Sequence, residues 1–237
     1  SLALKGKNIK GLATQDPKKL YRATQDKGLR YLASNYPKLI DEHDHEVAYL
    51  YKTMAETFSS ADYVYEKSKI YRSSQHYPKN KLGRSLKTIA ELIISGADTQ
   101  VYYASFSGFD THANQKNQHS RLLQNYSEAV TAFVNDLKKN NALDHTLVMT
   151  FSEFGRRVAQ NASNGTDHGT ANNLFLMGGN LKKAGVYNAA PNLTDLDKGD
   201  LKYQVDFREI YATILQKWMQ ADVNQVMSRS FNTLPLI

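Results

Sequence analysis

Residues 146–180, TLVMTFSEFGRRVAQNASNGTDHGTANNLFLMGGN, decide the fold that the sequence predicts. The stretch opens on a short apolar run, residues 147–151, and a second run, residues 174–177, lies near its end. Short apolar runs bounded by Gly, Asn and Ser are typical of strands covered on both faces, as in parallel sheets. We therefore expect two buried strands, with the polar residues between them gathered at one sheet edge, where open parallel sheets bind ligands.

Helical patterns alternate with a further predicted strand in the rest of the chain. The β-forming run TQVYYASF, residues 99–106, predicts that strand. Apolar spacing and capping residues predict helices over about 16–35, 41–59, 61–75, 82–96, 113–139 and 206–218. Helices alternating with strands indicate a right-handed α/β layout. The predicted fold is α/β, a mostly parallel sheet with helices on both faces, in a single domain spanning residues 1–237 or part of a larger one.

Composition excludes several classes of protein and of site. The chain has no cysteine, which excludes disulfides and thiolate metal sites. No apolar run approaches the length of a membrane helix, so no membrane span is expected. The formal charge is +7, but the basic residues are scattered in twos and threes, so no nucleic-acid partner is expected. A mild attraction for anionic substrates remains compatible with this charge.

Acidic and imidazole side chains stand at the ends of all three predicted strands. Asp110 and His112 follow the first, Glu153 and Arg156 follow the second, and Asp167 and His168 precede the third. Carboxylates and imidazoles converging from separate strand ends can hold a divalent cation. Mixed His and Asp ligation fits zinc or manganese best.

Each of these motifs has a structural alternative. Asp110 and Thr111 can cap the next helix, and His119 fits that helix's apolar face. Glu153 can pair with a neighbouring arginine, and residues 167–169 can form a turn. The acidic run DEHDHE, residues 41–46, holds two histidines but is also what the first turn of a helix favours.

Five motifs in order resemble a bacterial family catalogued as domain of unknown function 1501. The resemblance covers about the last 140 residues, with a weaker match back to Ser1-Leu2-Ala3-Leu4. The motifs are Gly108-Phe109-Asp110-Thr111-His112 with Gln115, Ser152-Glu153-Phe154-Gly155-Arg156, Gly165-Thr166-Asp167-His168-Gly169 with Ala171, Gly178-Gly179, and Asp206-Phe207-Arg208 with Tyr211.

That family is similar in turn to the alkaline phosphatase, sulfatase and cofactor-independent phosphoglycerate mutase superfamily, whose α/β sheet holds one or two divalent metals. The resemblance places Asp110, His112 and His168 at ligand positions. Glu153-Phe154 falls where the superfamily has Asp-His, so Phe154 departs from a two-metal pattern, while Glu153 and Asp167 are kept as ligands or supports. The superfamily's amino-terminal half, with its Ser or Thr nucleophile, has no counterpart here. The chain therefore resembles a carboxyl-terminal portion of an exported, periplasmic protein.

These features lead to two alternative functions. The first is a metal-dependent hydrolase of phosphate or sulfate esters, in which Arg156 neutralises charge on a small anionic substrate. An amino-terminal half, or another chain, would complete its site. The second is a non-catalytic binding or assembly module that retains the scaffold, as Phe154 and the missing nucleophile suggest.

Overall fold

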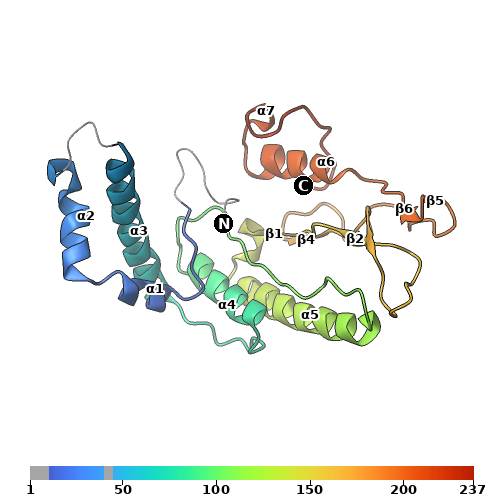
Figure 1. The fold of residues 1–237 in the computed structure, drawn as a ribbon, viewed down its shortest axis with the longest axis horizontal. Coiled ribbons are helices and arrows are strands. Elements are labelled where there is room, and N and C mark those ends of the chain that lie inside the picture. Colours follow the sequence, from blue (N-terminus) through green and yellow to red (C-terminus); the bar gives the residue numbers. More distant parts are fainter. Residues whose placement is uncertain (1–10, 40–44) are drawn as a thin grey trace. The chain divides into compact units, whose positions relative to one another are not determined.

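The computed structural model describes residues 11–39 and 45–237 (Figure 1). The chain forms two compact units. The first unit comprises Ser1–Phe106 and Ser127–Leu137, and the second comprises Ser107–Tyr126 and Lys138–Ile237. Helix α5, Gln115–Lys139, contributes residues to both units.

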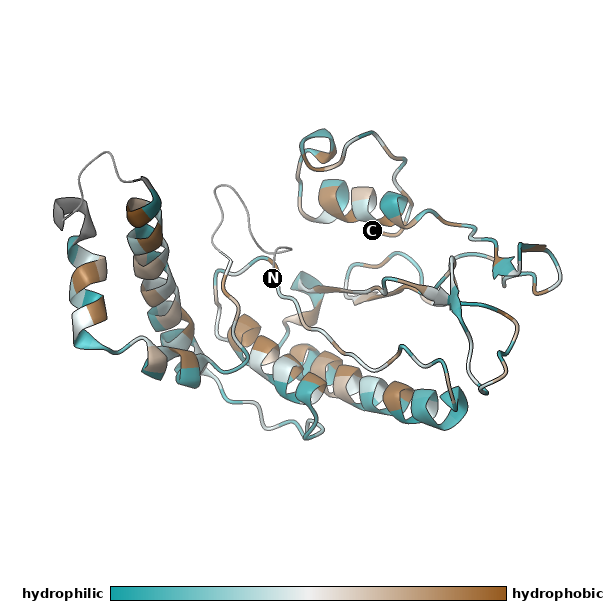
Figure 2. Ribbon diagram, viewed as in Figure 1, coloured by the Kyte–Doolittle hydropathy of each residue, from teal (hydrophilic) through white to brown (hydrophobic). Residues whose placement is uncertain are grey.

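The first unit is helical. Its other helices are α1 (Pro17–Ala23), α2 (Lys27–Leu39), α3 (His45–Ile70) and α4 (Lys81–Ile94). Asp16 caps α1, with proline at its first position, and Asn80 caps α4 through the backbone N–H of Gly83. In Figure 2, hydrophobic residues recur along α4 and α5 between hydrophilic ones. Such amphipathic helices turn their apolar stripe toward the core.

Nearly all the buried apolar side chains of the described residues lie in this first unit. Ala212, in the second unit, is the exception. The buried set in the first unit includes Ala61, Leu82, Leu86, Ala90, Leu92, Phe133 and Leu137. Fully buried apolar side chains are therefore concentrated in the first unit among the described residues.

A buried carboxylate also ties the first unit together. Asp136 is fully buried on α5 and accepts hydrogen bonds from the hydroxyls of Tyr71, at 3.0 Å, and Tyr77, at 2.9 Å. Burial raises the pKa of the Tyr77 hydroxyl, and the bond to Asp136 adds to that rise. The Tyr77 phenol thus stays protonated, and the two hydroxyls fasten the segment after α3 to α5.

The second unit contains short strands paired two by two. Strand β1 (Leu147–Thr150) pairs with β4 (Phe175–Gly178), in a register that places Leu147 opposite Gly178. Strand β2 (Gly155–Arg156) pairs with β3 (His168–Gly169), and β5 (Leu196–Asp197) pairs with β6 (Asp200–Leu201). The remaining elements are a 3₁₀ turn, Leu143–His145, helix α6 (Phe207–Thr213), a π-helical turn, Ile214–Trp218, and α7 (Val223–Val226).

The two central strands are confirmed, but their predicted orientation is wrong. All three pairings in the described residues are antiparallel. Parallel strands need a crossover connection of a dozen or more residues, usually a helix. The segment joining β1 to β4 contains the β2–β3 hairpin and no helix, so the chain turns back on itself. The expected burial is also absent, because the residues of β1 and β4 are half-buried except Phe175, which is exposed. A short apolar run predicts a strand but neither its burial nor its direction.

The strand predicted over residues 99–106 is not part of any sheet in the described residues. Exposure alternates from Val101 to Phe106, as in an extended chain, but no strand forms there. Its β-forming composition reflects side-chain preference, which does not by itself supply a ladder partner.

The predicted helices agree with the structure better than the predicted strands do. Helices α4 and α5 correspond to the segments predicted over 82–96 and 113–139. Helix α3 joins the described parts of the two helices predicted over 41–59 and 61–75, and it ends at Ile70. The helix predicted over 16–35 is divided into α1 and α2, and α2 continues to Leu39. Residues 41–44 of the acidic run, and the match at residues 1–4, lie outside the described residues. Within the described part of the chain, no helix has the length and apolar character needed to cross a membrane.

Candidate metal centre

The β2–β3 hairpin fixes one half of the site. Arg156 on β2 faces His168 on β3 in the ladder, beside the pair Gly155 and Gly169. A Cβ at Gly155 would overlap the carbonyl of Ala171, and one at Gly169 would lie 2.6 Å from the carbonyl carbon of Arg156. Glycine at both positions lets the backbones approach closely enough to set the direction of His168.

Arg156 links this hairpin to the loop before α5, which carries Asp110 and His112. Its Nη1 donates to the carbonyl of Thr166 at 2.7 Å, and its Nη2 donates to the carbonyl of Phe109. The buried hydroxyl of Thr111 lies 3.4 Å from Nη2 and 2.9 Å from Nε2 of His119. The guanidinium thus bridges two loops that are far apart in the sequence.

Three potential ligands meet at this junction. Nε2 of His168 donates to Oδ1 of Asp110 at 2.7 Å, and Nε2 of His112 lies 3.0 Å from the same oxygen. The ligand atoms of Asp110, His112 and His168 all lie within 4.8 Å of one another. We call these three residues the Asp110 cluster.

The Asp110 cluster fits a divalent ion in donor type and spacing. Ligands about 2.0–2.1 Å from a tetrahedral zinc ion are separated by about 3.4 Å, so small movements of these side chains suffice. The side chains of Asp110, His112 and His168 are 61%, 49% and 46% exposed. If these three residues bound an ion, their open surface would leave coordination positions for a further molecule, as in catalytic rather than structural zinc sites.

Electrostatics favour the ligand form of the carboxylate. The hydrogen bond from His168 lowers the pKa of Asp110, and the charges of His112 and Arg156 lower it further. The Arg156 guanidinium comes within 3.9 Å of its Oδ1. Asp110 is therefore ionised over a wide pH range, as a metal-binding carboxylate must be.

The other two predicted ligands lie differently. Oδ1 of Asp167 faces Nδ1 of His112 at 3.4 Å, on the far side of the ring from Asp110. A hydrogen bond from Asn161 lowers the pKa of Asp167, with a contribution from His112. Glu153 is exposed and is not among the three residues whose ligand atoms converge in the described chain. Asp167 thus occupies the position of a ligand's support.

Phe154 packs directly on the Asp110 cluster. Its ring stacks on the imidazole of His168 with centroids 3.8 Å apart and planes 8° from parallel. The Arg156 guanidinium carbon lies 5.1 Å from its ring centroid. The residue that departs from the two-metal pattern therefore holds the His168 ring in place.

The structural alternatives are partly realised. His119 supports the loop through Thr111 and lies 3.3 Å from the carbonyl of Phe109. Asp110 instead turns to the histidines, and the first N–H groups of α5 are taken by loop carbonyls: Asn114 donates to Ser163 and Gln115 to Asn164. As for the arginine next to Arg156 in the sequence, the Arg157 guanidinium lies 3.6 Å from the carboxylate of Asp200.

Sequence reasoning missed Asn161. Its side-chain amide donates to the carbonyl of His112 at 3.0 Å and to Oδ1 of Asp167 at 3.3 Å. The only signal in the sequence was its place in the polar loop NASNG, and that signal also fits an ordinary turn.

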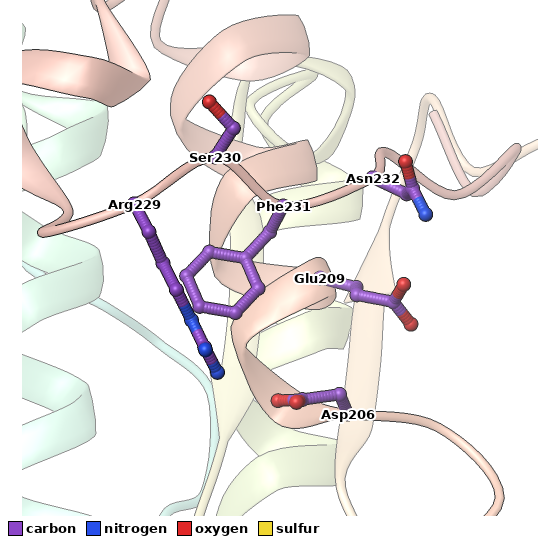
Figure 3. Close-up of a pocket in the computed structure, with 6 residues that line it drawn as sticks. All are labelled: Asp206, Glu209, Arg229, Ser230, Phe231 and Asn232. Atoms are coloured by element: carbon purple, nitrogen blue, oxygen red, sulfur yellow. The ribbon is translucent and has the colours of Figure 1, made fainter.

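The last motif, Asp206-Phe207-Arg208, lies at the start of α6 and makes its own set of contacts. Asp206 caps α6 and pairs with Arg208, whose guanidinium lowers the pKa of Asp206 to about 2. The guanidinium carbons of Arg208 and Arg229 lie 4.9 and 5.0 Å from the ring centroid of Phe231. Figure 3 shows the adjoining shallow depression, with Arg229 extending alongside the Phe231 ring. These contacts fasten the tail of the chain to α6.

Comparison with known proteins gives one assignment. No curated protein and no solved structure matches the chain. A family model described as "Protein of unknown function (DUF1501)" matches residues 2–233, nearly the whole chain. The chain therefore belongs to the DUF1501 family.

Proposed function

We propose that this protein is a metal-dependent hydrolase of phosphate or sulfate esters, built on the plan of the alkaline phosphatase and sulfatase superfamily. The observation that carries the proposal is the Asp110 cluster, in which one carboxylate and two imidazoles present their ligand atoms within 4.8 Å. Zinc or manganese suits this donor set. The proposed location, periplasmic or exported, rests on the family resemblance alone.

A bound divalent ion would supply Lewis-acid polarisation of the ester oxygens. The protein's own residues do the rest. Asp110 and the two imidazoles would hold the ion, and their exposed faces would leave room for a small anionic substrate. Phe154 keeps His168 from rotating away.

Arg156 would act on a substrate through the electrostatic effect of its positive charge and not through direct hydrogen bonds. Both of its terminal nitrogens already donate to backbone carbonyls, and its side chain is 18% exposed. Its positive charge nevertheless lies at the edge of the cluster, where charge on a phosphate or sulfate would be stabilised.

The nucleophile is proposed to come from another segment of the polypeptide or from another chain. Thr111, the hydroxyl flanked by two cluster residues in the sequence, is 3% exposed and engaged by His119. Attack on an ester needs an accessible oxygen beside a base. The same observation favours the second candidate, a binding or assembly module that keeps the metal scaffold without catalysis.

The first experiment measures metal content and activity together. The purified protein should retain about one zinc or manganese ion, and His168→Ala and Asp110→Ala should each lose it. His145→Ala is the matched control, because His145 is exposed and lies outside the cluster. Stoichiometric metal that survives both cluster substitutions would exclude this site.

The second experiment separates the two candidates. Hydrolysis of aryl phosphates and sulfates is measured with and without chelator. Activity that chelator abolishes and that His168→Ala lacks supports the hydrolase. Bound metal with no hydrolysis across a broad ester panel supports the binding module.

A further inference from the structure

We propose that Asn161 is a positioning residue that fixes the imidazole of His112 for metal binding, with Asp167 as its intermediary. This inference rests on the proposed metal site and adds a residue that does not itself touch the ion. It explains why the third motif carries an acid, Asp167, that lies behind the His112 ring and outside the group of convergent ligand atoms.

Asn161 holds His112 at both ends. Its Nδ2 donates to the backbone carbonyl of His112 at 3.0 Å and to Oδ1 of Asp167 at 3.3 Å. That same Asp167 oxygen lies 3.4 Å from Nδ1 of His112. One amide group therefore fixes where the backbone of His112 sits and where the carboxylate behind its ring points.

The amide is itself held rigidly. Its Oδ1 accepts the backbone N–H groups of Ser163 and Gly165, both at 3.0 Å. Both N–H donors and the oxygen are thus engaged, which uses most of the bonding capacity of an asparagine. An amide flip would place N–H groups against N–H groups, so the orientation is determined.

The surrounding loop is pressed against His112. A Cβ at Gly165 would overlap the carbonyl group of His112, so only glycine fits there. The carbonyls of Ser163 and Asn164 accept the N–H groups of Asn114 and Gln115. The loop is docked onto the segment that carries the ligand.

His112 needs such support because its side chain is 49% exposed. Its Nε2 faces Asp110 and its Nδ1 faces Asp167. Metal-ligating histidines commonly donate the other ring N–H to a carboxylate, and loss of such a partner typically costs about 10–100-fold in metal affinity.

The experiment compares zinc affinities by competition with a chromophoric chelator. Asn161→Ala and Asn161→Asp should both bind zinc about 10–100-fold more weakly. Asn161→Asp keeps the acceptor for Ser163 and Gly165 but loses the donors and sets a negative charge against Asp167. Gln160→Ala is the matched control, because Gln160 bonds Asn164 in the same loop and should leave affinity within about twofold.

Asp167→Asn keeps the inference testable if the Asn161 variants disturb the loop. It is nearly isosteric and removes the charge behind His112, so zinc affinity should fall by about tenfold. The NMR signals of the His112 ring in the metal-free protein give a second readout, and they should broaden or shift in Asn161→Asp but not in Gln160→Ala.

The outcomes distinguish the possible failures. Wild-type affinity in Asn161→Asp, with weak binding in Asn161→Ala, would mean that Asn161 only shapes the loop and would overturn the inference. Unchanged affinity in all Asn161 and Asp167 variants, while His112→Ala loses zinc, would overturn it and leave the metal site standing. A wild-type protein that binds no zinc would overturn the proposed function and this inference together.

Discussion

The two units each contain a carboxylate contacted by two aromatic side chains, and the two arrangements differ chiefly in burial. Asp136 in the first unit is fully buried beneath Tyr71 and Tyr77. Asp110 in the second unit is 61% exposed beside His112 and His168. Water is excluded from the first, so its hydrogen bonds hold the fold together. The second is open to solvent and its imidazoles can bind a metal, so it is available to a ligand.

The largest effect should come from removing the buried carboxylate. Asp136→Ala removes the acceptor shared by the Tyr71 and Tyr77 hydroxyls, and loss of the partner of a buried group such as the Tyr77 hydroxyl costs about 1–3 kcal/mol. We expect the free energy of unfolding to fall by about 4 kcal/mol in urea denaturation. Asp110→Ala is the matched control and should change it by less than about 0.5 kcal/mol. An equal fall in the free energy of unfolding in both variants would contradict the idea that only the buried carboxylate holds the fold together.

The second-largest effect should come from zinc, which we expect to protect the Asp110 cluster and not the region around Asp136. At a free zinc concentration of about 100 times the dissociation constant, binding should raise the free energy of unfolding by about 2.7 kcal/mol. Hydrogen exchange should slow at residues 109–115 and 161–169 and stay unchanged around Tyr71, Tyr77 and Asp136. Chelator should reverse the protection. Protection that appears equally in both regions would show that zinc does not act through the Asp110 cluster.

The smallest effect concerns alkaline pH. Burial raises the pKa of Tyr77, so its protonated form contributes stability below the unfolded pKa of about 10, and this contribution is lost as pH rises above it. Tyr77→Phe should lower the free energy of unfolding by about 1 kcal/mol at pH 7. The gap from wild type should shrink above about pH 10. A gap that stays constant with pH would contradict a raised pKa in the folded state.

Some features could be predicted from the sequence because they depend on local chemistry. Caps such as Asp16-Pro17 and the periodicity of α5 mark helices wherever they pack. The runs that became β1 and β4 were recognisable because short apolar runs bounded by turn residues are typical of strands. Strand direction was not encoded there, since it depends on how the intervening chain folds back.

The candidate site divides in the same way. Asp110, His112 and His168 stand out as the residue types that bind metals, and the structure brings them together, while their role as ligands stays a prediction. Glu153 looked equivalent in the sequence but is exposed and lies outside the convergent group of the described residues. Asn161 gave no distinguishing signal, since its role depends on contacts with residues 49 and 6 positions away.

The sequence by itself determined the family, the helices and the donor chemistry, because these follow from residue types and short-range spacing. The tertiary structure alone decided that the strands pair antiparallel, that Asp167 stands behind His112, and that Phe154 stacks on His168. The physical reason is the distance along the chain over which each interaction acts. Caps and apolar periodicity act within a few residues, whereas ladders, stacking and ligand geometry depend on which distant backbones are brought together.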